Sequence, residues 1–246
     1  MNEIQSLARG LKILDILGQN PDGISITELS EMLDVDKGSA SRLVATLATY
    51  GYAERDEVTR RYHVGSQIVS LSRSVLNRLP LREAAKPFLR QLMERTGECA
   101  HLGVAAQGKV MYIDQVESPV TLRVNAQVGT MNPLYCTALG KILLAFSDLD
   151  LPAEMPAFTE KTITDPGVLK EHLEQVRRLG YAVDDEEFDT GVRCIAVPIF
   201  DFRNKLAGAI GVSGPATRVT LARLPEMTAS VIEVGKALSE RMTFTR

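Results

Sequence analysis

Cysteine and histidine are scarce in this sequence, which narrows the kinds of fold and site that it can form. Its 246 residues include three cysteines and three histidines. The cysteines form no C-x-x-C pair and the histidines are scattered, so neither a disulfide framework nor a zinc finger is supported. We therefore expect no metal and no cofactor. The residues concerned are Cys99, Cys136 and Cys194, together with His63, His101 and His172.

A long apolar run is also missing. No stretch reaches the roughly 18 apolar residues that a membrane-spanning helix requires. Residues 1–14 form an amphipathic pattern, without the apolar block and small-residue cleavage site of a signal peptide. We therefore expect a cytoplasmic protein that does not contact membranes.

An excess of positive charge is absent as well. The formal net charge is −3, and residues 1–78 contain nine Lys and Arg against ten Asp and Glu. Phosphate binding depends on where the cations lie rather than on their total number. The charge is a mild argument against nucleic-acid binding, so a DNA-binding function must be supported by a motif.

The first 65 residues contain such a motif. Apolar residues at helical spacing predict a first helix, which ends in the turn GQNPDG. Ser25 and Glu28 form an S-x-x-E capping box for a second helix, and Asp36 is the expected N-cap of a third helix over 37–49. The residues that follow predict two short strands around a polar turn. This order is typical of a winged helix-turn-helix domain, which we assign to residues 1–65.

The remainder of the chain predicts a linker helix over 66–80 and a second domain over 81–246. Helices that cover an antiparallel sheet make this domain α+β. A Gln107–Gly108 turn is expected to join the two strands of its first hairpin. Helices are expected at 81–96, 137–146, 166–180 and 220–242, and strands within 98–117 and at 120–129, 181–187, 192–200 and 205–213.

Six segments in this order resemble the IclR family of bacterial transcriptional regulators along nearly the whole chain. In the first domain they are SLARGLKIL, SITELSEMLDVDKGSASRLVATLATYGYAERDE and RRYHVG; in the second they are NPLYCTALGKILLA, GYAVDDEEFDTGVRCIAVPIFD and AGAIGVSGPATRV. The resemblance implies a GAF-like effector domain and a homodimer or dimer of dimers. It further implies a repressor that binds double-stranded operator DNA and responds to a small organic acid from a catabolic pathway. We expect dimer contacts on the helices at 66–79 and 81–96, because each has an apolar stripe.

The helix over 37–49 is the expected recognition helix. Its outward face is short and polar, as entry into the major groove requires, and Arg42 can donate two hydrogen bonds to a guanine edge. A solvated surface is the alternative for these residues, and the helix-turn-helix context favours contact. The candidate DNA-binding residues are Arg9, Lys37, Ser39, Ser41, Arg42, Arg60 and Arg61.

The effector site is implied by the resemblance alone. In similar proteins a ligand carboxylate lies at the start of the helix that matches Thr137, where unpaired N–H groups attract an anion. The corresponding effector-binding residues are Thr137, Ala138, Leu139, Asp184, Cys194, Gly211 and Ser213. Some relatives have a second serine where this chain has Gly211, and many have histidine where it has Tyr135. The loss of one hydroxyl adds space and leaves room for a sugar acid or an aromatic acid.

Two other functions remain as alternatives. The acidic balance of the first domain is compatible with a protein-interaction module that no longer binds DNA. A cysteine-dependent enzyme would use Cys194 with a base such as His101, yet no glycine-rich phosphate loop and no metal-ligand cluster support an enzyme. We expect a regulator that is not an enzyme, and we expect His101 to be an ordinary strand residue.

Overall fold

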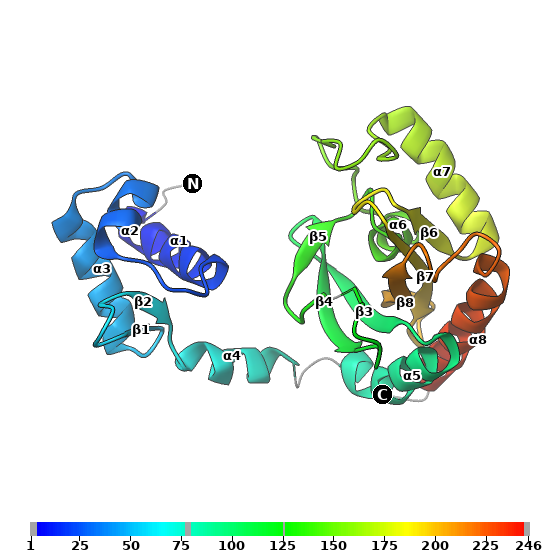
Figure 1. The fold of residues 1–246 in the computed structure, drawn as a ribbon, viewed down its shortest axis with the longest axis horizontal. Coiled ribbons are helices and arrows are strands. Elements are labelled where there is room, and N and C mark those ends of the chain that lie inside the picture. The colour runs from blue at the N-terminus through cyan, green and yellow to red at the C-terminus, as the bar shows by residue number, and fades with distance from the viewer. Residues whose placement is uncertain (1–3, 77–79, 125, 244–246) are drawn as a thin grey trace. The chain divides into compact units, whose positions relative to one another are not determined.

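The computed structural model describes residues 4–76, 80–124 and 126–243 of the chain. The chain divides into two compact units, Met1–Arg78 and Leu79–Arg246 (Figure 1). The finer division expected from the sequence, with a separate linker helix, stays a prediction. No helix among the described residues has the length and apolar character needed to cross a membrane.

The first unit is a winged helix-turn-helix, as predicted. The capping box is confirmed: the Ser25 hydroxyl accepts from the Glu28 N–H, and the Glu28 carboxylate accepts from the Ser25 N–H at 2.7 Å. Asp36 caps the third helix by accepting from the Ser39 N–H. Residues 77–79 of the expected linker helix lie outside the described residues. The elements of this unit are α1 (Gln5–Gln19), α2 (Ile26–Leu33), α3 (Lys37–Thr49), β1 (Ala53–Arg55), β2 (Tyr62–Val64) and α4 (Gln67–Leu76).

The second unit is an antiparallel sheet covered by helices, which confirms the α+β prediction. Its strands are ordered β5-β4-β3-β8-β7-β6, so the chain crosses from one half of the sheet to the other between β5 and β6. The elements are α5 (Pro80–Thr96), β3 (Cys99–Ala106), β4 (Lys109–Val116), β5 (Met131–Pro133), α6 (Ala138–Ala145), α7 (Pro166–Leu179), β6 (Ala182–Asp185), β7 (Val192–Phe200), β8 (Leu206–Pro215) and α8 (Leu224–Thr243).

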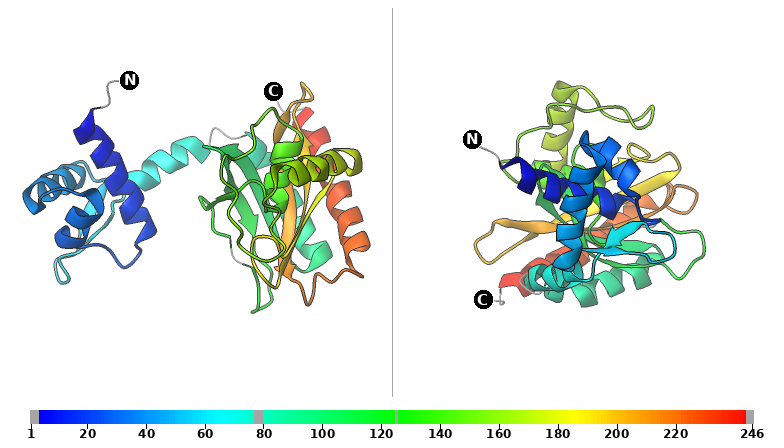
Figure 2. Two further views of the ribbon diagram at one scale, coloured as in Figure 1. Left: turned by 90° about the horizontal axis from the view of Figure 1, so that it is seen from above. Right: turned by 90° about the vertical axis from the view of Figure 1, so that its left-hand side faces the viewer.

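The two faces of this sheet are covered by different helices. Side chains alternate along each strand, so Ile195 faces one hydrophobic core with α5 and α8, whereas Ala196 faces another with α6 and α7. The right-hand panel of Figure 2 shows α7 on one side of the strands and α5 on the other.

The apolar stripe of α5 is used inside the second unit. Its buried residues pack in the same core as α8 and one face of the sheet. The stripe therefore has a partner within the chain, and it no longer supports the dimer contact that we expected on this helix. The residues concerned are Leu81, Ala85, Leu89 and Leu92.

The strand expected at 120–129 is wrong. None of the described residues in that range forms a strand, and a short β5 further along the chain pairs with β4 instead. The alternation of Val120, Leu122 and Val124 suggested a strand, yet the first two side chains are exposed. Gly129 has φ +93°, and its N–H donates to the Tyr112 carbonyl. The turn at this glycine ends any extended run before β5 begins.

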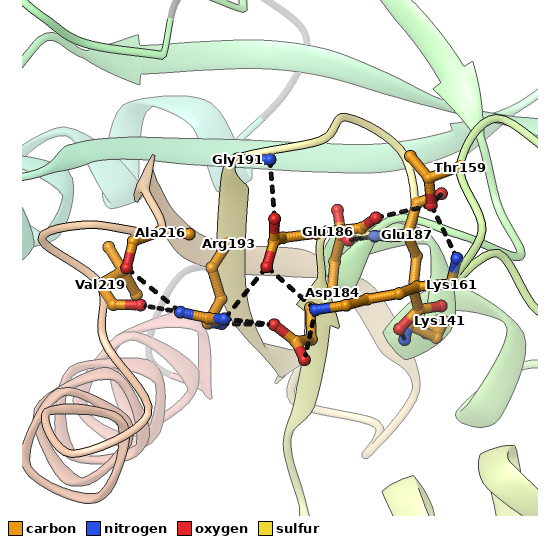
Figure 3. Close-up of polar contacts among 11 residues, drawn as sticks. Lys141, Thr159, Lys161, Asp184, Glu186, Glu187, Gly191, Arg193, Ala216 and Val219 are labelled. Atoms are coloured by element: carbon orange, nitrogen blue, oxygen red, sulfur yellow. Dashed lines mark hydrogen bonds and ion pairs between the residues drawn. The ribbon is translucent and has the colours of Figure 1, made fainter.

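A buried ion pair ties α6 to the loop that follows β6 (Figure 3). The Lys141 side chain is 0 % exposed, and its Nζ lies 2.5 Å from Oε1 of Glu187. The same ammonium donates to the Val183 carbonyl and contacts Nε2 of His172 at 3.3 Å. Burial and the Lys141 charge lower the pKa of His172 to about 4, so its ring is neutral at physiological pH and can accept this hydrogen bond.

Replacement of Lys141 by methionine should destabilise the second unit strongly. Glu187 would remain buried without its partner, and the loss of one member of a buried pair typically destabilises by about 3–5 kcal/mol. The double variant Lys141→Met/Glu187→Met removes both charges and should recover much of this loss. Urea unfolding followed by far-UV circular dichroism measures the effect, because the chain has no tryptophan.

Lys86→Met is the matched control. Lys86 pairs with Glu83 on the surface, where both side chains are at least half exposed, and such pairs contribute about 0–1 kcal/mol. Equal effects of the two lysine substitutions would contradict the assigned role of Lys141.

Candidate functional site

Helix α3 presents a short polar face to solvent. Ala40 and Val44 are fully buried in the first unit, which fixes the orientation of the helix. Gly38 and Ala45 are exposed and small, so this face has little side-chain bulk to keep another molecule away. Of the predicted contacts on this helix, two are exposed, Lys37 and Arg42, and two are half-buried, Ser39 and Ser41.

A chain of hydrogen bonds orients Arg42 on that face. The Asp36 carboxylate accepts from the Ser39 hydroxyl at 2.6 Å, and the Ser39 hydroxyl accepts from the Arg42 guanidinium at 3.2 Å. The hydrogen bonds from Ser39 also hold the pKa of Asp36 below its ordinary value. The N-cap of α3 therefore positions the guanidinium that the sequence singles out for base recognition.

The other three predicted DNA contacts are arginines outside α3. Arg9 is half-buried on α1, and Arg60 is exposed at the turn between β1 and β2, with φ +62°. Arg61 is held within the unit: its guanidinium donates to the Gly23 carbonyl and to the Glu28 carboxylate at 2.9 Å. A contact between Arg61 and DNA would require these bonds to break, so Arg60 is the better placed of the two arginines in this turn.

A cavity of about 190 Å³ lies in the second unit, on the face of the sheet that α6 covers. It is smaller than the roughly 300–1,000 Å³ pockets that hold drug-sized ligands, so it suits a small metabolite. The fold brings together positions that lie up to 76 residues apart, from residue 137 to residue 213. The seven residues predicted for the effector site all line this cavity: Thr137, Ala138, Leu139, Asp184, Cys194, Gly211 and Ser213.

The strand register explains how three of these side chains meet. Asp184 on β6 lies opposite Cys194 on β7, and Cys194 lies opposite Ser213 on β8. Directly opposed residues of neighbouring strands point to the same face, so the three form a row across the sheet. Gly211 lies two residues before Ser213 on that face, and a Cβ there would collide with the Ile195 carbonyl oxygen.

The start of α6 forms another wall of the cavity. The Thr137 hydroxyl caps the helix by accepting from the Gly140 N–H at 3.2 Å, and it donates to the Pro133 carbonyl at 2.7 Å. The N–H groups of Ala138 and Leu139 lie in the first turn, which has no intrahelical acceptors for them. Because the helix dipole is positive at this end, the turn favours an anion.

Asp184 gives the cavity a titratable acid. Burial is the main cause that raises its pKa to about 7, although the hydrogen bond from the Glu187 N–H and the charge of Lys141 act in the opposite direction. None of the described residues that line the cavity is Lys or Arg. The cavity therefore attracts an anionic ligand through the positive end of α6, and protonation of Asp184 reduces the repulsion of that ligand.

The structure adds lining residues that the sequence did not indicate. His101 on β3 was expected to be an ordinary strand residue, yet it is 2 % exposed and lines the cavity. Its ring packs edge-on against Tyr112, with ring centroids 5.5 Å apart. Tyr112, Asn132 and Phe188 also line the cavity. An isolated histidine on a strand gives no sequence signal, because its position depends on the pairing of strands far apart in the chain.

Cys194 lacks the surroundings of a catalytic nucleophile. Burial raises the pKa of its thiol well above the ordinary value, so the reactive thiolate is disfavoured. Neither ring nitrogen of His101 has a hydrogen-bond partner among the described residues, so the two side chains do not form a Cys–His pair. This geometry argues against the cysteine-dependent enzyme considered from the sequence.

Comparison with known proteins gives matches along nearly the whole chain. Residues 6–57 match the IclR helix-turn-helix domain, and residues 73–240 match the bacterial transcriptional regulator IclR C-terminal family. The HTH-type transcriptional regulator BhcR of Paracoccus denitrificans is 40% identical over 242 residues, which cover 96% of this chain and 86% of that protein. The transcriptional repressor IclR of Escherichia coli is 31% identical, with 96% and 89% covered.

A solved structure agrees with these matches. The crystal structure of the Thermotoga maritima IclR has a TM-score of 0.77 and 31% identity to this chain, and the alignment covers 98% of this chain and all of that one. The relatives are named as regulators, so the protein is a regulator rather than an enzyme. The chain belongs to the IclR family of DNA-binding transcriptional regulators.

Proposed function

We propose that this protein is a repressor whose binding to operator DNA is modulated by a small carboxylate from a catabolic pathway. The observation that carries the proposal is the convergence of α6, β6, β7 and β8 on one small cavity with an anion-attracting helix start. The relative named a transcriptional repressor supports the sign of the regulation. Access to chromosomal DNA places the protein in the cytoplasm under this proposal.

The DNA-binding part of the proposal rests on α3. Its exposed face combines small residues with a positioned Arg42, which suits close approach to base edges in the major groove. The N-terminus of the same helix also favours nearby phosphate oxygens. Lys37, Ser39 and Ser41 lie on the first turns of α3, where they would accompany Arg42 into the groove.

Reading an operator with two half-sites requires more than one copy of the chain. A dimer reads both half-sites when its recognition helices lie about 34 Å apart. The apolar residues Ile4, Leu7 and Leu11 are exposed and follow one another at helical spacing at the start of α1, and we propose that a second copy covers them. Val69 and Leu71 are also exposed on α4, where we expected a dimer contact. Either a homodimer or a dimer of dimers would satisfy the spacing.

The gating part of the proposal follows from linkage. A ligand alters the affinity for DNA only if it binds two states of the protein with different affinity. The cavity is formed by a helix start and by strands that come from distant parts of the chain, so a ligand that contacts both can favour one arrangement of them. The ligand then shifts the protein towards that arrangement, and the observed affinity for the operator shifts towards the affinity of that arrangement.

The direct test measures DNA binding in the presence of candidate ligands. Fluorescence anisotropy with the DNA upstream of the protein's own gene should show tight binding that weakens as salt increases. At least one member of a panel of small carboxylates should shift the Kd several-fold. If operator binding occurs and no carboxylate changes it, the effector part of the proposal is wrong.

Substitution of Arg42 tests the DNA contact. A bidentate contact with guanine gives about 1–3 kcal/mol of discrimination, so Arg42→Ala should weaken specific operator binding about 5- to 160-fold. Lys86→Ala is the control, since it removes one positive charge from the second unit. An unchanged Kd for the Arg42 variant, with intact far-UV circular dichroism, would favour a protein-interaction module instead.

Ligand binding should weaken as the pH rises through about 7. Below this pH Asp184 is protonated and neutral, whereas above it the ionised carboxylate repels an anionic ligand, so the Kd should increase by up to about tenfold per pH unit. Three other titratable side chains of the cavity wall, His101, Tyr112 and Cys194, do not change charge near pH 7, because the pKa of His101 is lowered to about 4 and burial raises the pKa values of Tyr112 and Cys194. The carboxylate of Asp189 also lines the cavity.

Titrations of Asp184→Asn between pH 6 and 8.5 check this assignment. The variant should lose the slope, because its amide does not ionise. A slope of the same size in that variant would assign the effect to another group, such as Glu187, whose pKa burial also raises.

A further inference from the structure

His101 is a buried polar side chain whose hydrogen-bonding atoms are unused. The residue is 2 % exposed, and neither Nδ1 nor Nε2 has a hydrogen-bond partner in the described part of the chain. Buried side-chain polar atoms usually have at least one partner, so both orphaned nitrogens of one ring require an explanation. The ring also lines the cavity that α6 covers.

The neighbours of His101 do not supply that partner. Gly211 lies directly opposite on β8 and has no side chain. Tyr112 contacts the ring edge-on and forms no hydrogen bond with either ring nitrogen. The polar edge of the ring therefore remains for whatever occupies the cavity.

We propose that His101 recognises a hydroxyl group of the effector, which makes the ligand class a small hydroxycarboxylate. This inference rests on the proposed function, because it places the ligand carboxylate at the start of α6. Leu139 of that helix start approaches β3 closely, since a Cβ at Gly103 would lie 3.2 Å from its side chain. His101 lies two residues before Gly103 on the same face of β3. His101 and the start of α6 both line this cavity of about 190 Å³, so a molecule of a few carbon atoms can contact both.

The protonation state of the ring favours a hydroxyl over other groups. Burial lowers the pKa of His101 to about 4, so at physiological pH the ring is neutral, with one N–H donor and one acceptor nitrogen. A neutral imidazole supplies no positive charge for a second carboxylate. A hydroxyl can accept from the ring N–H or donate to the other nitrogen, so either tautomer satisfies it.

Pairs of acids that differ in one hydroxyl test the assignment. The probes are lactate with propionate, glycolate with acetate, and 3-hydroxybutyrate with butyrate, titrated into the full-length protein by calorimetry. The wild type should prefer the hydroxy acid of at least one pair about 10- to 100-fold, the effect of one hydrogen bond to a buried group. His101→Leu should lose the preference while it retains the affinity for the simple acid, and His101→Asn should restore part of it.

The outcomes separate this inference from the proposed function. If the wild type binds simple acids as well as hydroxy acids, the ligand class is wrong while the carboxylate site stands. If His101→Leu keeps the hydroxyl preference, the role of His101 is wrong; if no acid of any pair binds, both the class and the carboxylate site fail. His63→Leu in the first unit is the matched control and should leave the preference unchanged. Thermal unfolding shows whether His101→Leu is still folded. If it is, and if His101→Asn keeps part of the preference for the hydroxy acid, the loss of that preference comes from the cavity and not from misfolding.

Discussion

The ion pair between Lys141 and Glu187 is the contact on which the geometry of the cavity depends. Lys141 lies one turn after the helix start that lines the cavity, and Glu187 lies just after the strand that supplies Asp184. The Glu187 N–H also donates to the Asp184 carboxylate at 2.8 Å. A buried ion pair repays its desolvation only with good geometry and further hydrogen bonds. The bonds from Lys141 to Val183 and His172 supply these, so α6 is held against β6.

The electrostatics of the cavity follow from that arrangement. Lys141 is neutralised by Glu187 and is not among the residues that line the cavity. Attraction for an anion then comes from the backbone at the start of α6, whose partial charges need no counterion. Asp184 modulates this attraction through its protonation. Burial keeps the Asp184 carboxyl partly protonated near neutral pH, which reduces its repulsion of an anion in the cavity.

Much of the fold could be predicted because its signals are local. The capping box at Ser25, the N-cap at Asp36 and the Gln107–Gly108 turn each depend on residues a few positions apart, and the structure has all three. Gln107 and Gly108 both have positive φ, as a two-residue hairpin turn of type I′ requires. The strand expected at 120–129 was wrong. The alternation of apolar residues shows a strand-like spacing, but it does not show whether those side chains are buried, and burial depends on the rest of the fold.

The effector site could be predicted only through the family resemblance. The resemblance placed seven residues in the effector site, and the structure places all seven on one cavity, although their role in ligand binding stays a prediction. His101 was missed because nothing in the sequence marks a residue whose importance arises from strand pairing across more than a hundred positions, as between His101 and Gly211. An unsatisfied polar atom is a property of the folded chain alone. It identifies a candidate ligand contact that neither periodicity nor spacing can reveal, and it does so without reference to any relative.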